Sequence, residues 1–272
     1  MRENELRAVE GRLEAFLEGL TGFMGRRDRR AWAGAYVRGL LLDGERKSAE
    51  PMAARLGKSK QGLQQFVSQS PWPAEVLLAG LVERESRGPA PACWIIDETS
   101  FPKAGKHSVG VARQYCGAVG KIANCQVAVS LHRVGPRPGE SRPLSWRLYL
   151  PETWTKNATG RAAAGIPAQV CYQSKTDLAL SVIDEALGWG AKAGVVLADE
   201  AYGGSFEWRA ALRARALAYV VRVPWTTTGW KAAPVFEAQK LTAKGRPARR
   251  PRPLGPEPQD VRKIARGLPA AA

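Results

Sequence analysis

Val195-Val196-Leu197-Ala198-Asp199 is a short apolar run that ends in an aspartate. Far upstream, the run Trp94-Ile95-Ile96-Asp97 repeats this pattern. Short apolar runs are typical of buried strands, so each run is expected to deliver a carboxylate at the end of a strand. Two carboxylates side by side repel each other, and a divalent cation relieves that repulsion. Asp97 and Asp199 therefore predict a metal site, and the competing interpretation is two ordinary surface acids at strand ends.

The charge of the chain is strongly positive. Its 272 residues contain 41 Lys and Arg against 25 Asp and Glu, a formal net charge of +16. Such an excess favours nucleic acid or another anionic surface as the partner. It is concentrated near the C-terminal end, because residues 209–272 hold 14 of the basic residues and 3 of the acidic ones. We expect the proline-rich residues 225–272 to be part of an insertion, or extended and disordered.

Composition argues against two further classes of protein. No run of about 18 apolar residues occurs, which predicts a chain without a membrane span. The first 30 residues are too polar for a secretory signal peptide, so we expect a cytoplasmic protein. The four cysteines show no C-x-x-C pairing, and two histidines accompany them. We therefore expect reduced, mostly buried thiols and no zinc site.

The first 88 residues are predicted to be helical. Apolar side chains recur at helical spacing over 6–20, 29–42 and 74–85. Two shorter helical segments lie between them, at 51–56 and 60–68. They surround Gly57, and the second one would expose Lys60 and Gln64. Such a pair of helices fits a helix-turn-helix that reads DNA through Lys60 and Gln64, and it also fits an ordinary helical hairpin.

Residues 89–224 are predicted to form a mixed α/β core after a linker at 86–91. In 125–133 the apolar residues would face one side and the polar residues mostly the other, and 146–150 would pair with it as a hairpin. The expected elements in chain order are strands 92–97, 125–133 and 146–150, helix 176–189, strand 194–199, helix 206–215 and strand 217–223. This order predicts a mixed sheet flanked by helices, with a helical region before it.

Four longer strings resemble a known family. Residues 97–115, which begin Asp97-Glu98-Thr99-Ser100-Phe101-Pro102-Lys103, resemble the first catalytic block of bacterial insertion-sequence transposases of the DDE superfamily, and 120–130 continues it. Residues 148–154 and 198–203 are similar to later blocks of that family. The resemblance runs from about residue 25 to the C-terminus.

The resemblance implies a ribonuclease-H-like fold and cut-and-paste DNA chemistry at transposon ends. The family's first two acids correspond to Asp97 and Asp199, which would both hold Mg²⁺ or Mn²⁺. The implied partners are the duplex DNA of the transposon ends and of the target, bound by a homodimer in the bacterial nucleoid. Glu98 and Glu200 are not expected to be primary ligands, because neighbouring side chains on a strand point to opposite faces.

The family's third acid, a glutamate on a helix after a long insertion, has no clear counterpart here. After Val223 the acids are Glu237, Glu257 and Asp260, and none lies in a convincing amphipathic helix. We therefore expect a C-terminally truncated transposase with weak or no catalysis. One alternative is a non-catalytic DNA-binding remnant that occupies transposon ends. Another is a basic RNA-binding structural protein.

A basic segment follows the first acid. Lys103, Lys106, His107 and Arg113 are expected to contact the DNA backbone near the scissile phosphate. The other interpretation is a solvated loop that carries lysines. Tyr202, just after the second acid, would either stack on a nucleotide or pack beneath its loop.

Overall fold

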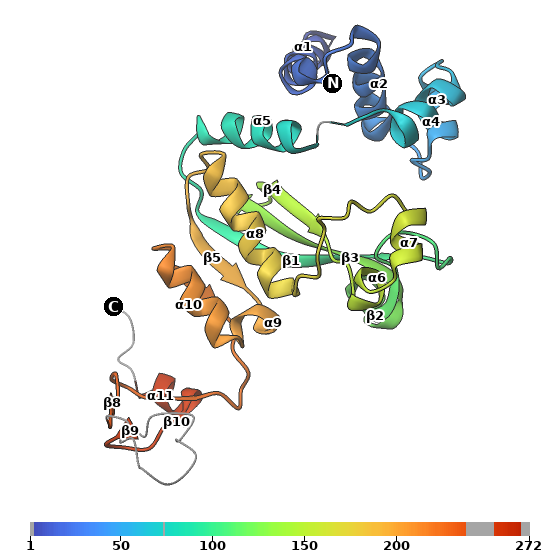
Figure 1. The fold of residues 1–272 in the computed structure, drawn as a ribbon. Coiled ribbons are helices and arrows are strands. Elements are labelled where there is room, and N and C mark those ends of the chain that lie inside the picture. The colour runs from blue at the N-terminus through green and yellow to red at the C-terminus, as the bar shows by residue number, and fades with distance from the viewer. Residues whose placement is uncertain (1–2, 73, 238–252, 268–272) are drawn as a thin grey trace. The chain divides into compact units, whose positions relative to one another are not determined.

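The computed structural model describes residues 3–72, 74–237 and 253–267 (Figure 1). The chain divides into two compact units. The first unit comprises residues 1–92, 130–147 and 181–193, and the second comprises 93–129, 148–180 and 194–272. Within the described ranges, no helix combines the length and apolar character needed to cross a bilayer.

Helices make up the N-terminal part of the first unit, as the apolar spacing predicted. They are α1 (Glu3–Thr21), the 3-10 turn η1 (Gly22–Met24), α2 (Arg27–Leu41), α3 (Ala49–Arg55), α4 (Lys60–Gln69) and α5 (Ala74–Ser86). The five α-helices begin and end within a few residues of their expected bounds, and η1 was not predicted. Whether a domain boundary lies at 86–91 stays a prediction.

A four-residue turn, 56–59, joins α3 to α4. Gly57 has φ +59°, in the left-handed region that glycine enters without steric cost. The amides of Gly57 and Lys58 donate to carbonyl oxygens of the last turn of α3, at 3.2 and 2.9 Å. The hydroxyl of Ser59 then accepts from the amide of Gly62 at 3.2 Å and caps α4. The turn therefore fixes the direction of α4 relative to α3.

The inner face of α4 packs on α2 and α3. Leu63 is buried with Met52 of α3, Phe66 is buried with Ala33 of α2, and Trp32 packs against both clusters. Full burial of a side chain such as Leu or Phe contributes roughly 1.5–3 kcal/mol. The three helices thus share one small core, and α4 turns its remaining face outward.

The longer strands form one mixed, six-stranded sheet (Figure 1). They are β1 (Cys93–Pro102), β2 (Ala112–Cys116), β3 (Lys121–Val134), β4 (Ser141–Leu148), β5 (Val195–Ala198) and β6 (Tyr219–Val221). Their order is β2-β3-β1-β5-β6, and β4 also pairs with β3. β5 runs parallel to β1 and to β6, whereas β2 is antiparallel to β3. This arrangement confirms the ribonuclease-H-like α/β fold and the β3–β4 pairing predicted from the sequence.

Helices follow the strands of this core. They are η2 (Gly117–Val119), α6 (Glu152–Thr155), α7 (Ala158–Ala163), α8 (Lys175–Gly188), α9 (Glu200–Gly203) and α10 (Phe206–Ala214). α8 and α10 were expected, whereas β2 and the short helices were not. Ser130 departs from the predicted alternation in β3, because it is buried although it was expected on the polar face. Cys116 and Cys125 are buried as expected, but Cys171 is exposed.

The described residues beyond β6 form short elements. They are β7 (Thr228–Gly229), β8 (Val235–Phe236), β9 (Pro253–Leu254), β10 (Gln259–Asp260) and α11 (Val261–Arg266). β7 pairs with β10 and β8 with β9, both antiparallel. These residues therefore carry secondary structure, which the expectation of a disordered tail did not include. Residues 238–252, with most of the basic run, lie outside the described residues.

A buried carboxylate ties α5 to β3 and β4 in the first unit. Oε2 of Glu85 lies 2.6 Å from the guanidinium of Arg133 and 2.6 Å from that of Arg142. The side chains of Glu85 and Arg133 are 15% and 7% exposed. Burial would raise the pKa of Glu85, but hydrogen bonds and charge from Arg142 and Arg133 outweigh burial and lower it. The ionised form is therefore the one that the fold stabilises.

Glu85→Gln is expected to lower the free energy of unfolding at pH 7 by roughly 3 kcal/mol, because the buried Arg133 loses its counter-charge. The folded pKa of Glu85 lies below its unfolded value, so the stabilisation is present above the unfolded pKa. It is lost as pH falls through the folded pKa. Denaturant unfolding should therefore show the wild-type advantage shrinking between about pH 5 and pH 3.

The matched control is Glu83→Gln on the same helix. Glu83 pairs with Arg87 at 2.6 Å, and both side chains are more than half exposed. This exposed pair should contribute less than about 1 kcal/mol. Equal losses in the two variants, or a constant gap down to pH 3, would contradict the assigned role of Glu85.

Candidate active site

Two acids come together on neighbouring strands because of the register between β1 and β5. Asp199 directly follows the end of β5 as predicted, but the prediction that Asp97 ends its strand is wrong, because β1 continues to Pro102. In this parallel pair, Ile96 lies opposite Ala198. Asp97 follows the first and Asp199 follows the second, so one further step along both strands sets the two acids side by side. Adjacent strands lie about 4.8 Å apart, and residues paired in register point to the same face. Both aspartates are exposed.

Backbone amides orient both carboxylates. Oδ1 of Asp97 accepts from the amide of Glu98 at 2.7 Å. Oδ1 of Asp199 accepts from the amide of Ala201 at 3.0 Å, which makes Asp199 the N-cap of α9. α9 lies close to the end of β6, since a Cβ on Gly203 would stand 1.9 Å from the carbonyl oxygen of Arg222. Glycine at 203 is thus required for the path of the chain after Asp199.

Glu98 has a different environment from Asp97. Its carboxylate forms an ion pair with Lys175, the first residue of α8, and accepts from the hydroxyl of Tyr202 at 3.3 Å. Tyr202 is 1% exposed and packs on Trp208, with ring centroids 5.6 Å apart. Burial, and then the charge of Glu98, raises the pKa of Tyr202 well above its ordinary value, so the hydroxyl stays a donor. Tyr202 therefore packs in the core, and the idea that it stacks on a nucleotide is wrong.

Residues 103–111, the basic loop, run from β1 to β2 and are held by side chains from other elements. The side-chain Nδ2 of Asn124 donates to the carbonyl oxygens of Lys103 and Gly105, both at 2.8 Å. The amide nitrogen of Gln126 donates to the carbonyl oxygen of Val109 at 2.6 Å. The indole of Trp154 donates to the carbonyl oxygen of Val111 at 2.8 Å. The loop is therefore fastened at several points along its backbone.

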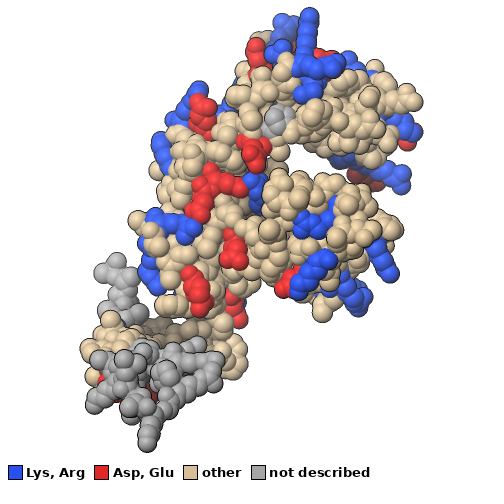
Figure 2. All heavy atoms as spheres, viewed as in Figure 1, with Lys and Arg blue, Asp and Glu red and all other residues tan. Residues whose placement is uncertain are grey.

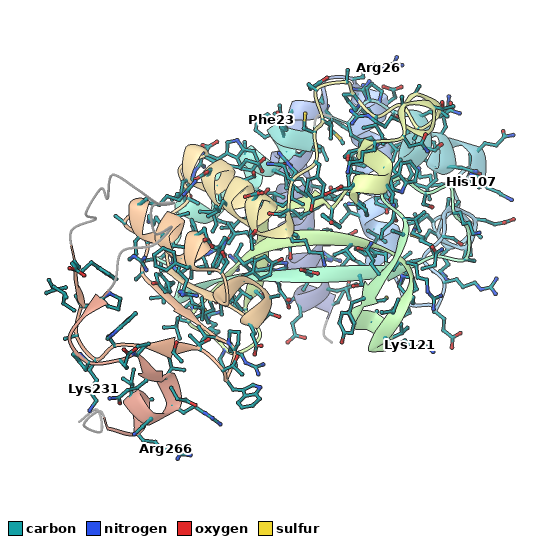
Figure 3. All side chains as sticks on the ribbon, turned by 60° about the horizontal axis from the view of Figure 1, so that its bottom comes forward. Phe23, Arg26, His107, Lys121, Lys231 and Arg266 are labelled. Carbon is teal, nitrogen blue, oxygen red and sulfur yellow. The ribbon has the colours of Figure 1, made fainter. Side chains whose placement is uncertain are left out.

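The cationic side chains of this region have different exposures. Lys106 and His107 are exposed on the basic loop, whereas Lys103 is half-buried. Figure 3 labels His107. Lys106 and His107 also line a hollow of about 450 Å³ together with Trp154 of α6 and residues of α7. Arg113 is exposed on β2, opposite Asn124 of β3. Of the four residues predicted to contact the DNA backbone after the first acid, three thus lie on one loop and the fourth lies on the strand that follows.

The two remaining predicted DNA contacts belong to the first unit. Lys60 and Gln64 lie on α4, and both are exposed. Nζ of Lys60 lies 2.9 Å from Oε1 of Glu50, in an ion pair between α4 and α3.

A third acid next to Asp97 and Asp199 is not found in the described ranges, where no group of three or more His, Cys, Asp or Glu side chains is placed to hold a metal. Asp260 instead caps α11 and pairs with Arg262 at 2.8 Å, and the hydrogen bond from Arg262 lowers its pKa to about 2. Glu257 is exposed on the segment before β10.

Sequence reasoning missed the residues that support the site. Asn124 and Gln126 carry a signal of their own, because amide side chains on a strand that becomes largely buried need hydrogen-bond partners. Their partners, however, lie about twenty residues away and cannot be read from spacing. Lys175 gave no signal, since a lysine at a helix start is usually solvated.

Comparison with known proteins places these features in a family. The family model described as "DDE superfamily endonuclease" matches residues 15–272. The chain is also 34% identical over 171 residues to "Probable transposase for insertion sequence element IS701" of Microchaete diplosiphon. That alignment covers 61% of this chain and 41% of the relative, so the match spans less than half of the relative's length. Because the family model covers nearly the whole sequence, the chain belongs to the DDE superfamily endonucleases.

Proposed function

We propose that the chain acts as a DDE-type DNA transposase, which cleaves and transfers DNA strands at transposon ends. The observation that carries the proposal is the β1–β5 register, because it brings Asp97 and Asp199 together from positions far apart in the sequence. Membership of the endonuclease family and the name of the relative support the same chemistry.

Endonucleases of this family use divalent metal ions. The two aspartates fit such an ion, because hard cations prefer oxygen donors and Mg²⁺ usually takes one or two protein carboxylates. We propose that Asp97 and Asp199 are the catalytic residues that hold Mg²⁺ or Mn²⁺. A bound ion of this kind polarises a phosphodiester and lowers the pKa of water.

DNA contacts are assigned to both units. Lys103, Lys106, His107 and Arg113 would hold the backbone of duplex DNA, since cationic side chains bind phosphates without reading sequence. The N-terminal residues 1–88 would bind the transposon ends through the helix-turn-helix of α3 and α4, with Lys60 and Gln64 outward. Residues 89–224 would be the catalytic core and 225–272 part of an insertion. A homodimer on the DNA, in the bacterial nucleoid, completes the proposal.

A second candidate is a DNA-binding protein with little or no catalysis that occupies transposon ends. It is favoured by one observation, that among the described residues no third carboxylate joins Asp97 and Asp199. Catalysis by these 272 residues alone is accordingly proposed to be impaired. The two candidates share their DNA contacts and differ in whether Mg²⁺ or Mn²⁺ permits strand cleavage.

Asp97→Asn and Asp199→Asn are each expected to weaken Mn²⁺ binding by about 100-fold or more, because even indirect partners of a metal contribute 10- to 100-fold. Both substitutions keep the size of the side chain and remove its charge. Titration calorimetry measures the binding, and nicking of a supercoiled plasmid that carries the transposon ends measures catalysis in parallel. Any nicking by the wild-type chain should disappear in both variants.

Glu200→Gln is the matched control, since Glu200 is an exposed acid directly beside Asp199. It should bind Mn²⁺ like the wild type. Equal weakening of Mn²⁺ binding in all three variants would show non-specific attraction to surface charge and would contradict the proposed metal site. Tight Mn²⁺ binding without nicking would favour the second candidate.

Lys106→Ala and Arg113→Ala are expected to lower affinity for duplex DNA of any sequence. Each loss of a phosphate contact should reduce the slope of log K against log salt by about 1. Fluorescence anisotropy across a salt series measures both quantities. Arg7→Ala is the control, because Arg7 is an exposed cation that already pairs with Glu3 four residues away. An unchanged slope in both test variants would show that the side chains of Lys106 and Arg113 are solvated and do not contact DNA.

A further inference from the structure

The outward face of α4 is unusually rich in amide side chains. The helix has 10 residues, and its exposed positions include four glutamines but no acid. The four are Gln61, Gln64, Gln65 and Gln69. A solvated helix face normally carries mixed charges, which favour solubility and helix stability. A row of uncharged groups that both donate and accept hydrogen bonds fits another kind of surface, the edges of bases.

The helix that bears this face is held rigidly. The hydroxyl of Ser59 caps its first turn, and Leu63 and Phe66 are 0% and 2% exposed in the core beneath it. Gly62 permits the close packing, because a Cβ there would stand 2.2 Å from the ring of Trp32. The direction of the outward side chains is therefore set by packing, which is what sequence readout requires of a recognition helix.

Cationic side chains lie at both ends of the glutamine row. Lys58 is exposed just before α4. Near the other end, Arg26 and Arg29 line a hollow of about 430 Å³ together with Gln65 and Gln69 (Figure 3). Arg26 also pairs with Asp28 at 2.8 Å but remains exposed. Figure 2 shows blue side chains along the outer edge of this region. Cations on either side of an uncharged face suit a helix that lies between two lines of phosphates.

The charges on α4 also limit which DNA base its exposed side chains can recognise. Guanine is most often read by Arg or Lys, and cytosine by Asp or Glu. α4 has no exposed acid. Its one cation, Lys60, forms an ion pair with Glu50, with Nζ 2.9 Å from Oε1. A glutamine amide makes two hydrogen bonds to adenine, accepting from N6 and donating to N7. The first turns of a recognition helix are those that reach base edges.

We propose that α4 lies in the major groove of duplex DNA and that Gln61 and Gln64 select adenine there, so that the bound end sequence has A·T pairs at the α4 contact. This inference rests on the proposed function and adds to it a specificity. Gln65 and Gln69, beside the arginine hollow, adjoin the phosphates and carry no base preference.

The test uses the full chain carrying Asp97→Asn, without divalent metal, so that binding is separated from cleavage. Duplexes are selected from a random pool and sequenced, and anisotropy compares the selected duplex with an unselected one. Adenine should be enriched at one or two adjacent positions. Gln64→Ala should lower affinity for the selected duplex about 10-fold, within the range that one bidentate base contact supplies, and leave the unselected duplex unchanged. Gln64→Arg should shift the preference at that position from adenine to guanine.

Gln69→Ala is the matched control and should keep the adenine preference. Circular dichroism confirms that each variant is folded. Salt-dependent binding without adenine enrichment, or an equal loss on both duplexes in Gln64→Ala, overturns the adenine inference and leaves the proposed function standing. No binding to duplex DNA, or preference for folded RNA, overturns both.

Discussion

The parallel hydrogen bonding of β1 with β5 is the constraint on which the candidate active site depends. Trp94 and Val196 are opposite each other and fully buried, so the register is fixed by the core of the sheet. A slip of one residue would turn these side chains to the other face and separate Asp97 from Asp199. Two acids that are 102 residues apart in the chain are thus held by packing, and the geometry does not rely on a mobile loop.

The basic loop is organised by a different interaction, in which side-chain amides hold backbone carbonyl groups. Asn124 and Gln126 lie on β3, and each donates to the loop that begins at the end of β1. Hydrogen bonds hold the backbone of the loop that carries Lys106 and His107. That backbone therefore loses little further conformational entropy when a ligand binds. Under the proposed function, binding of DNA there would cost less conformational entropy than ordering a free loop, so the same number of phosphate contacts would yield more affinity.

The apolar runs and helical spacing predicted the longer helices and five of the six strands of the main sheet because those signals are local. The two aspartates were found for the same reason, since each ends an apolar run. The rest depended on contacts between distant residues. Tyr202 reaches Glu98 across 104 positions, and nothing near either residue indicates that pairing. Arg133 lies on the same face of β3 as the buried Val129 and Leu131, and its burial is compensated by Glu85 of α5, a partner that no local pattern indicates. The strand pairs after β6 are two residues long and leave no periodic pattern at all.

The distribution of charge around the aspartates ties metal and DNA together. Glu98 is adjacent to Asp97, but its charge is balanced by Lys175, so it adds little to the negative charge there. Asp97, Asp199 and the exposed Glu200 beside Asp199 remain as local negative charges in a chain of net charge +16. Under the proposed function, without a cation they would repel the phosphates of DNA that Lys and Arg elsewhere on the chain attract. A divalent ion removes that repulsion, and by linkage DNA must strengthen the binding of the ion by the same factor. Under the proposed function, binding of the metal ion and binding of DNA would therefore depend on each other.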